Sequence, residues 1–211
     1  MTRTNLPTLA VAATLAFAAA LGLSMPLAGQ FLPDSPRLTG VLEEPGFGVY
    51  YLRPSALPGD DVGAMVTWKP SSLPDPVRLR FGGGIGAGDT GAGFAGLDVR
   101  VPLQPARGSV RLAWTAGIGG SYGEWGIVSL PVGLVAGVVW SEGAVTLSPW
   151  AGVGVGFDYQ FGDTAPDEEF EVRPAADLGL DLSFDRARRV TVRVGLSLGD
   201  RNALAAGIAV R

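Results

Sequence analysis

Hydrophobic residues alternate with small or polar residues along most of the chain beyond residue 45. The alternation is clearest over residues 145–161, where the odd positions are mostly apolar and the even positions are mostly glycine or polar. Successive side chains of a β-strand point to opposite faces of the sheet. This segment is therefore predicted to be a strand with one apolar face and one small or polar face.

The same alternation recurs along the chain and predicts ten strands. Clusters of turn-forming residues, among them Gly88-Asp89-Thr90-Gly91 and Ser141-Glu142-Gly143, separate the alternating segments. No segment between them has helical periodicity, so the sheet is predicted to be antiparallel. The predicted strands lie near residues 46–53, 61–69, 77–88, 91–103, 109–120, 126–140, 144–161, 170–185, 189–199 and 202–211.

Charged residues within these predicted strands lie on the small, glycine-rich face. In a soluble sandwich the apolar faces meet each other, and strands longer than ten residues are unusual. In a membrane barrel the apolar face contacts lipid and the other face lines the lumen. The pattern therefore favours an all-β fold, a closed antiparallel up-and-down transmembrane β-barrel of about eight to ten strands. The charged residues on the predicted lumen face are Arg78, Arg80, Asp98, Arg100, Arg111, Asp158, Asp177, Asp181 and Arg193.

These lumen charges are expected to form ion pairs, because an unpaired charge in a narrow and poorly hydrated interior is costly. Which arginine meets which aspartate depends on the strand register, and the alternation alone does not reveal it. The glycines of the same face are expected to leave room inside the barrel. On that basis a substitution such as Gly154→Ser is expected to have a mild effect.

The first 30 residues predict a secretory signal peptide. Arg3 precedes an apolar run over residues 9–23, and the small residues Ala28-Gly29 follow it. A single transmembrane anchor is the alternative, but Pro26 and the small residues after it favour cleavage. The predicted organisation is a signal peptide over residues 1–30, a leader or short plug-side segment over 31–45, and an outer-membrane barrel over 46–211.

An even number of strands places both chain termini at the periplasmic end of a bacterial barrel. The segment 162–169 then becomes an external loop, and 185–189 becomes a short periplasmic turn. Aromatic residues near several strand ends are expected to form girdles at the two membrane interfaces. These residues are Trp68, Trp114, Trp125, Trp140, Tyr50 and Tyr51, whereas Trp150 falls on the lumen face and is expected to pack inside.

The composition excludes several kinds of chemistry. The chain of 211 residues contains neither cysteine nor histidine. It therefore has no thiolate, no disulfide, no lipidated cysteine and no histidine general base. Asp177 and Asp181 share a strand face, but their Cα atoms are expected to lie about 13 Å apart, too far to share a proton. With a net charge of −4 and no basic block, the chain also lacks the features of a nucleic-acid-binding protein. We predict a protein that is not an enzyme and has no cofactor.

Two further motifs suggest alternative binding sites, one for phosphate and one for a divalent cation, and we favour neither. The segment Gly82-Gly83-Gly84-Ile85-Gly86 has the composition of a phosphate loop, but no helix is predicted to follow it. An acidic cluster supplies ligands suited to a divalent cation, but its spacing matches no EF-hand, and a solvated external loop is the preferred interpretation. The cluster consists of Asp163, Asp167, Glu168, Glu169 and Glu171.

A signal peptide followed by alternating strands with a charged, glycine-rich inner face resembles the small bacterial outer-membrane barrels. Examples of such barrels are the transmembrane domain of OmpA and the proteins OmpX and OmpW. The resemblance covers residues 46–211 and is one of architecture. It implies outer-membrane lipid and the barrel assembly machinery as partners. The chain departs from such barrels at its end, Ala209-Val210-Arg211, where they often carry an aromatic residue.

The expected function is a structural or passive role in the outer membrane. A narrow porin for small solutes is the first alternative, although eight or ten strands leave an interior mostly filled by side chains. A secreted, soluble β-sandwich that binds a ligand is the second alternative.

Overall fold

The computed structural model describes residues 38, 41, 46–54, 62–74, 76–85, 91–103, 109–123, 125–162, 170–185, 187–199 and 202–211. The predicted signal peptide, most of the predicted leader and the acidic segment 163–169 lie outside these ranges. Within the described ranges, no helix is long and apolar enough to cross a membrane.

The described chain forms eleven strands close to the predicted positions. The predicted strand over residues 126–140 is divided at Val139 into β6 and β7. The strands are β1 (Phe47–Pro54), β2 (Val62–Trp68), β3 (Val77–Ile85), β4 (Gly91–Pro102), β5 (Val110–Tyr122), β6 (Gly126–Val138), β7 (Trp140–Glu142), β8 (Val145–Phe161), β9 (Phe170–Ser183), β10 (Val190–Gly199) and β11 (Ala203–Val210).

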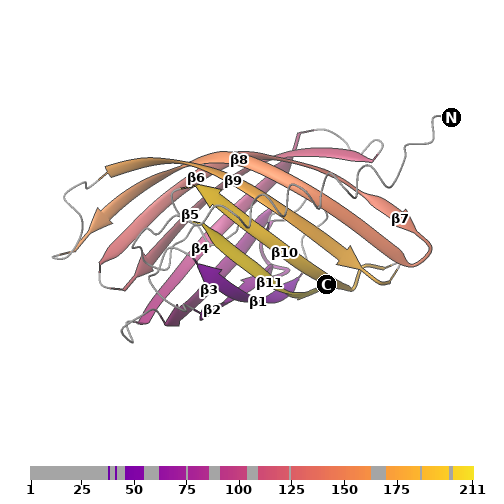
Figure 1. The fold of residues 1–211 in the computed structure, drawn as a ribbon, viewed down its shortest axis with the longest axis horizontal. Helices are drawn as coiled ribbons and strands as arrows, with labels where there is room; N and C mark the ends of the chain where they lie inside the picture. The colour runs from indigo at the N-terminus through magenta and orange to yellow at the C-terminus, as the bar shows by residue number, and fades with distance from the viewer. Residues whose placement is uncertain are drawn as a thin grey trace.

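The strands close into one antiparallel barrel of ten strands (Figure 1). The first strand pairs with the last, in a register that runs from Phe47 opposite Val210 to Pro54 opposite Ala203. On the other side of the ring β6 pairs with β8, and β7 continues the line of β6 along the same neighbour. The predicted up-and-down barrel is therefore confirmed, with ten strands and not eight.

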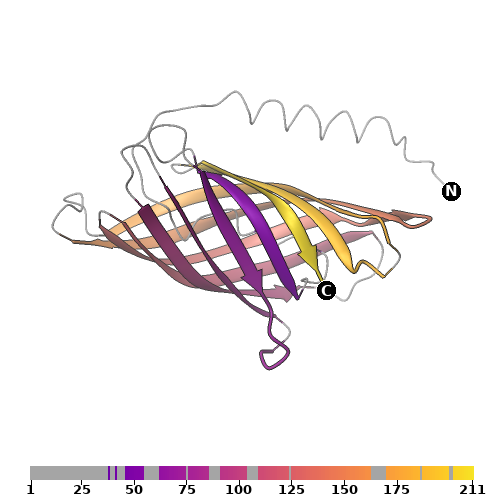
Figure 2. The ribbon, with the colours of Figure 1, turned by 90° about the horizontal axis from the view of Figure 1, so that it is seen from below.

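Ring closure also shows that the β-sandwich alternative is wrong. A sandwich keeps two separate sheets with edge strands. Here each of the ten wall strands has a hydrogen-bonded neighbour on both sides. Figure 2 shows the tilted strands wrapping around a single interior.

The two faces of the wall follow the predicted alternation. Along β8, outward Val153 is 65% exposed, whereas inward Asp158 is fully buried. The same inward and outward parity holds on β5 and β10, where Ala113 and Arg193 are buried and Ile118 and Val190 are exposed. The barrel is therefore apolar outside and partly charged inside.

The structure corrects the expectation that lumen glycines only leave room. Gly154 on β8 lies directly opposite Gly133 on β6. A Cβ atom added to Gly154 would lie only 2.4 Å from the backbone oxygen of Val132. Because that contact is with backbone, it cannot be relieved by a side-chain rotation. Gly154 therefore permits a close approach of two strands, and Gly154→Ser is not expected to be mild.

The turn between β9 and β10 matches the predicted turn at 185–189. The Asp185 carboxylate accepts hydrogen bonds from the backbone N–H groups of Arg189 at 3.0 Å and Val190 at 3.4 Å. The hydrogen bond from Arg189 is the main cause that lowers the pKa of Asp185. The stabilisation of this turn is therefore present while the carboxylate is ionised, and it is lost as the pH falls through the lowered pKa.

Two glycines on the inner face of β8 allow a matched test of the close strand approach. Gly154→Ala is expected to destabilise the barrel by about 1–3 kcal/mol, because the new methyl group meets backbone. Gly156→Ala is the control, since an added Cβ atom there would meet only side-chain atoms and one backbone oxygen at 3.6 Å or more. Urea unfolding midpoints in detergent micelles measure both effects. Equal midpoints for the two variants would contradict the close approach.

Candidate functional site: the charged interior

One group of buried charges links β3 to β4. Arg78 lies directly opposite Asp98, and its Nη2 atom is 3.1 Å from the carboxylate. Arg80, on the same face of β3, approaches the same carboxylate with Nε at 3.2 Å and Nη2 at 3.3 Å. All three side chains are almost completely buried. One carboxylate therefore accepts hydrogen bonds from two guanidinium groups, which is the charge-assisted pairing that a dry interior requires.

A second buried pair links β10 to β9. Arg193 lies directly opposite Asp181, and two parallel hydrogen bonds of 2.7 and 2.8 Å join the guanidinium to the carboxylate. Both side chains are buried. This two-bond geometry holds the guanidinium in one orientation.

The two groups meet at the backbone of Leu38, in the segment before the first strand. The Leu38 carbonyl oxygen accepts a hydrogen bond from Nη1 of Arg193 at 2.6 Å and from Nη1 of Arg78 at 3.4 Å. Their strands, β10 and β3, are separated in the ring by β11, β1 and β2. Leu38 is fully buried and has a φ of +48°. The chain before β1 therefore enters the barrel, and two wall arginines hold it there.

Apolar side chains fill the interior around Leu38. Val41 is also buried, and its Cγ2 atom lies 2.6 Å from the position that a Cβ on Gly137 would occupy. The buried apolar cluster consists of Leu38, Val41, Tyr50, Leu52, Met65, Phe94, Ala113, Val135, Trp150, Ala205 and Ala209. The inner face is therefore less uniformly small and polar than the alternation indicated.

Tyr50 corrects one of the expected girdle positions. It was expected at a membrane interface, but it is 1% exposed and points into the barrel. Its ring lies beside Gly207 of β11, the residue directly opposite in register, where a Cβ atom would come within 2.7 Å of the ring. The neighbouring Tyr51 is the exposed member of the pair. Strand parity therefore assigns one tyrosine to each side of the wall.

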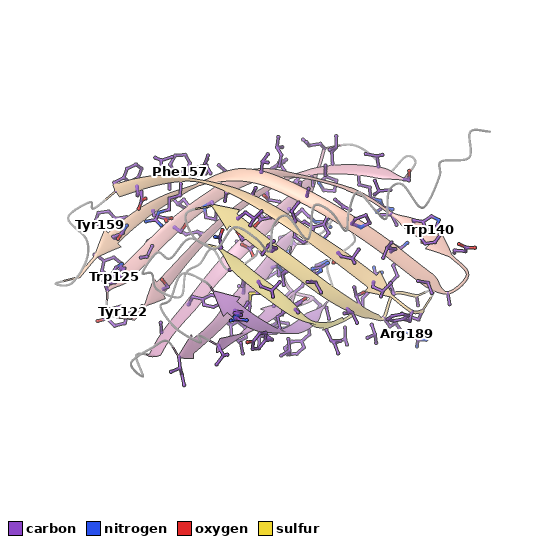
Figure 3. The ribbon with its side chains drawn as sticks, in the orientation of Figure 1. Tyr122, Trp125, Trp140, Phe157, Tyr159 and Arg189 are labelled. Carbon is purple, nitrogen blue, oxygen red and sulfur yellow. The ribbon has the colours of Figure 1, made fainter. Side chains whose placement is uncertain are left out.

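The other aromatic residues are placed mostly as expected. Figure 3 shows Tyr122, Trp125, Phe157 and Tyr159 gathered at one end of the barrel and Trp140 at the other. Exposed outward tryptophans also include Trp68 and Trp114, whereas Trp150 is buried inside, against Gly179 of β9. The external aromatic residues are thus concentrated towards the ends of the wall, where amphipathic rings favour an interface.

A polar cluster lies at the end of the barrel opposite the start of β1 and the end of β11. Asp158 is fully buried, and Nε of Arg173 is 3.5 Å from its carboxylate. Arg173 also forms an ion pair with Glu171, and the Gln160 amide donates a hydrogen bond to Glu171 at 3.1 Å. The predicted lumen set omitted Arg173. Glu171 was expected in a solvated external loop, but it lies directly opposite Asp158 in the register of β8 and β9.

The remaining predicted lumen residues also lie on the inner face, but they are only partly buried. Asp177 lines a cavity of about 10 Å³ with Thr115 and Trp150, a volume that suits about one water molecule. Arg100 on β4 and Arg111 on β5 are half-buried. The Nε atom of Arg111 is buried without a hydrogen-bond partner, and no ion pair joins Arg111 to a described carboxylate.

Among the described residues, no group of three or more histidine, cysteine or acidic side chains is arranged to hold a metal ion. Most of the acidic cluster that raised this alternative, residues 163–169, lies outside the described residues. What the described interior offers is a set of guanidinium donors aimed at oxygen acceptors.

Comparisons with known proteins give structural similarities at low sequence identity. No protein-family model and no curated protein matches the chain. A bacterial polysaccharide outer membrane secretin matches with a TM-score of 0.44 and 8% identity over 76% of this chain. The chain spans 57% of that secretin's length, a little more than half. The KdgM porin in complex with disordered oligogalacturonate matches with a TM-score of 0.38 and 7% identity, over 78% of this chain and 98% of the porin.

The Arg193–Asp181 pair generates a test of the buried charges. Asp181→Asn is expected to destabilise the barrel by about 3–5 kcal/mol, because it leaves a buried guanidinium without its counter-charge. Arg193→Met combined with Asp181→Leu is expected to cost less than the sum of the two single changes. Urea unfolding in detergent micelles gives the values for Asp181→Asn, Arg193→Met, Asp181→Leu and the double variant.

The matched control is the Arg189–Asp185 pair, in which the arginine side chain is 78% exposed. Asp185→Asn is expected to cost about 1 kcal/mol or less, because solvent screens the exposed pair. Losses of the same size at Asp181 and Asp185 would show that the interior charges are hydrated.

Proposed function

We propose that this protein is an integral outer-membrane β-barrel with a structural or passive role in the envelope, and that it is not an enzyme. The observation that carries this proposal is the polarity of the wall. Large apolar side chains such as Leu134 and Val153 are exposed outside, whereas Arg193 and Asp181 are buried as an ion pair inside. In water this arrangement exposes extensive apolar surface, whereas in a bilayer the same surface contacts lipid.

Strand lengths support a membrane location. A transmembrane β-strand needs about 9–11 residues. The strands β4, β5, β6, β8 and β9 contain 12, 13, 13, 17 and 14 residues. Tilted strands of this length reach across the apolar layer of a bilayer, and ring closure gives each wall strand a hydrogen-bonded neighbour on both sides.

The proposal includes the route and orientation of the chain. A signal peptide over residues 1–30 directs export, and residues 46–211 form the barrel after a leader over 31–45. The start of β1, the end of β11 and the turn after β9 share one end of the barrel, which we assign to the periplasm. The segment 163–169 then joins β8 to β9 at the external end. Outer-membrane lipid and the barrel assembly machinery are the proposed partners, as for the small barrels of the OmpA, OmpX and OmpW kind.

A narrow porin for small solutes is the second candidate. It is favoured by the polar cluster at the external end, where the side chains of Glu171 and Arg173 are 28% and 16% exposed. Polar groups that reach solvent at one mouth are suited to admit a solute. At the opposite end, however, the arginine–aspartate groups and Leu38 fill the interior, so the resting barrel is expected to be closed.

The depth dependence of an added charge distinguishes a membrane barrel from a soluble one. Val153 lies at the middle of β8 and Val145 at its end, and both side chains are exposed on the outer face. Val153→Arg is expected to cost about 2–4 kcal/mol in lipid vesicles, and Val145→Arg about 0–1 kcal/mol. Urea unfolding of vesicle-inserted protein measures both. Equal small costs would point to a barrel that stays in water.

Fractionation and conductance together test the proposed role. The protein is expected to remain in the outer-membrane fraction after carbonate washing, because the apolar wall is embedded in lipid. Purified protein in planar bilayers is expected to show no steady stepwise conductance, because buried side chains close the lumen. Carbonate-extractable protein would contradict the membrane location, and steady conductance of the unmodified protein would favour the porin.

A further inference from the structure

We propose that Leu38 and Val41 form a displaceable plug over an oxyanion-binding site made by Arg78 and Arg193. In the resting barrel the Leu38 carbonyl occupies this site. After displacement the site takes a carboxylate or phosphate oxygen of a solute. The inference rests on the proposed membrane barrel and adds a ligand class and a closing device to it.

The two guanidinium groups converge on one point inside the barrel. Arg78 and Arg193 come from strands on well-separated parts of the wall, yet their Nη1 atoms donate to one oxygen atom. Asp98 accepts a hydrogen bond from Nη2 of Arg78, and Asp181 accepts hydrogen bonds from Nε and Nη2 of Arg193. Both guanidinium groups are therefore pre-oriented towards one point inside the barrel.

An anionic oxygen suits this point better than the group that now occupies it. Guanidinium nitrogen atoms only donate hydrogen bonds, so any occupant must supply an acceptor. Hydrogen bonds from a guanidinium to a carboxylate or phosphate are charged at both partners and are stronger than those to a neutral carbonyl. The Leu38 carbonyl thus stands where the oxygen of an anionic solute would bind.

The plug can leave without opening the wall. The ring closes through the β1–β11 and β6–β8 pairs, and neither Leu38 nor Val41 belongs to a strand. Leu38 also has a φ of +48°, a left-handed conformation that a residue with a Cβ atom adopts at an energetic cost. Displacement would therefore break side-chain packing and the arginine contacts while leaving the strand ladder intact.

Val41 occupies a space that the wall leaves for it. Gly137 faces inward on β6, and a Cβ atom there would lie 2.6 Å from Val41 and 2.8 Å from the backbone oxygen of Pro149. The side chain of Val41 thus fills the volume above a glycine. Removing the side chains of both Leu38 and Val41 should loosen the plug while keeping the length of the chain.

A cysteine reporter inside the barrel makes the plug measurable. The chain has no native cysteine, so a single introduced thiol reports one position. Ser148 on β8 is fully buried and lies directly opposite Asp181, and its hydroxyl has no hydrogen-bond partner. Ser148→Cys therefore places a thiol beside the proposed site with little change in volume.

The experiment compares labelling rates of this thiol in protein inserted into phosphatidylethanolamine–phosphatidylglycerol vesicles. Leu38→Ala with Val41→Ala is the plug variant, because alanine removes the packing and keeps the Cβ atom at the left-handed Leu38 position. Leu73→Ala with Leu103→Ala is the control, because both leucines lie at the same end of the barrel outside the buried cluster. Vesicle flotation first establishes insertion of each protein. Negatively and positively charged methanethiosulfonates are then used as matched probes.

The plug variant is expected to label about tenfold faster than the parent, because opening exposes a buried site. The negative probe is expected to react faster than the positive probe, and inorganic phosphate is expected to slow labelling by occupying the arginines. The control variant is expected to label at the parent rate. If the double variant does not insert, Val41→Ala alone gives the same comparison with a smaller increase.

The outcomes separate this inference from the proposed function. Failure of the unmodified protein to insert would contradict both. Insertion with unchanged labelling in the plug variants would overturn the plug while leaving the membrane barrel intact. Faster labelling that favours the positive probe, or that phosphate does not slow, would overturn the oxyanion site.

Discussion

The structure depends on closure of its backbone hydrogen-bond ring. A bilayer offers no partner to a free N–H or C=O group, so a sheet can cross it only if its first and last strands pair. Here β1 pairs with β11, and β6 pairs with β8. Closing only ten strands curves the wall tightly and leaves a narrow interior. The outer side chains then need only be apolar, whereas each inner side chain must fit beside its neighbours and find partners for its polar atoms.

The interior meets this requirement differently at its two ends. Near the start of β1 and the end of β11, buried arginines contact aspartates on adjacent strands and also hold the Leu38 carbonyl. At the opposite end, Asp158 contacts Arg173 in a cluster that is partly open to solvent. The charged groups near the start of β1 contact Leu38 and fill that end of the interior. Under the proposed displacement of Leu38 and Val41, a packed barrel and an open pore would differ by the position of these two residues.

Glycine has a more specific role than composition indicates. A glycine-rich inner face can mean an open lumen or a wall whose strands approach closely. Gly154 and Gly207 both belong to the second kind, since a Cβ atom at either would meet the backbone of the adjacent strand. Elsewhere, Gly179 gives space to the ring of Trp150. Much of the volume that glycine frees is thus used by backbone curvature and by aromatic rings inside the barrel.

The sequence by itself determined the strands, their antiparallel order and the side of the wall that the nine predicted lumen charges occupy, because strand periodicity is local and the facing of each side chain follows from parity. Arg193 and Asp181 could be assigned to the interior in this way. Only the tertiary structure decided that these two are partners, that Arg173 meets Asp158, and that Tyr50 lies inside. Those contacts depend on register and curvature, which join residues far apart in the chain. The position of Leu38 in the lumen also depends on the tertiary structure. Its carbonyl accepts hydrogen bonds from Arg78 and Arg193, which lie 40 and 155 residues away in the sequence and come together only when the barrel closes.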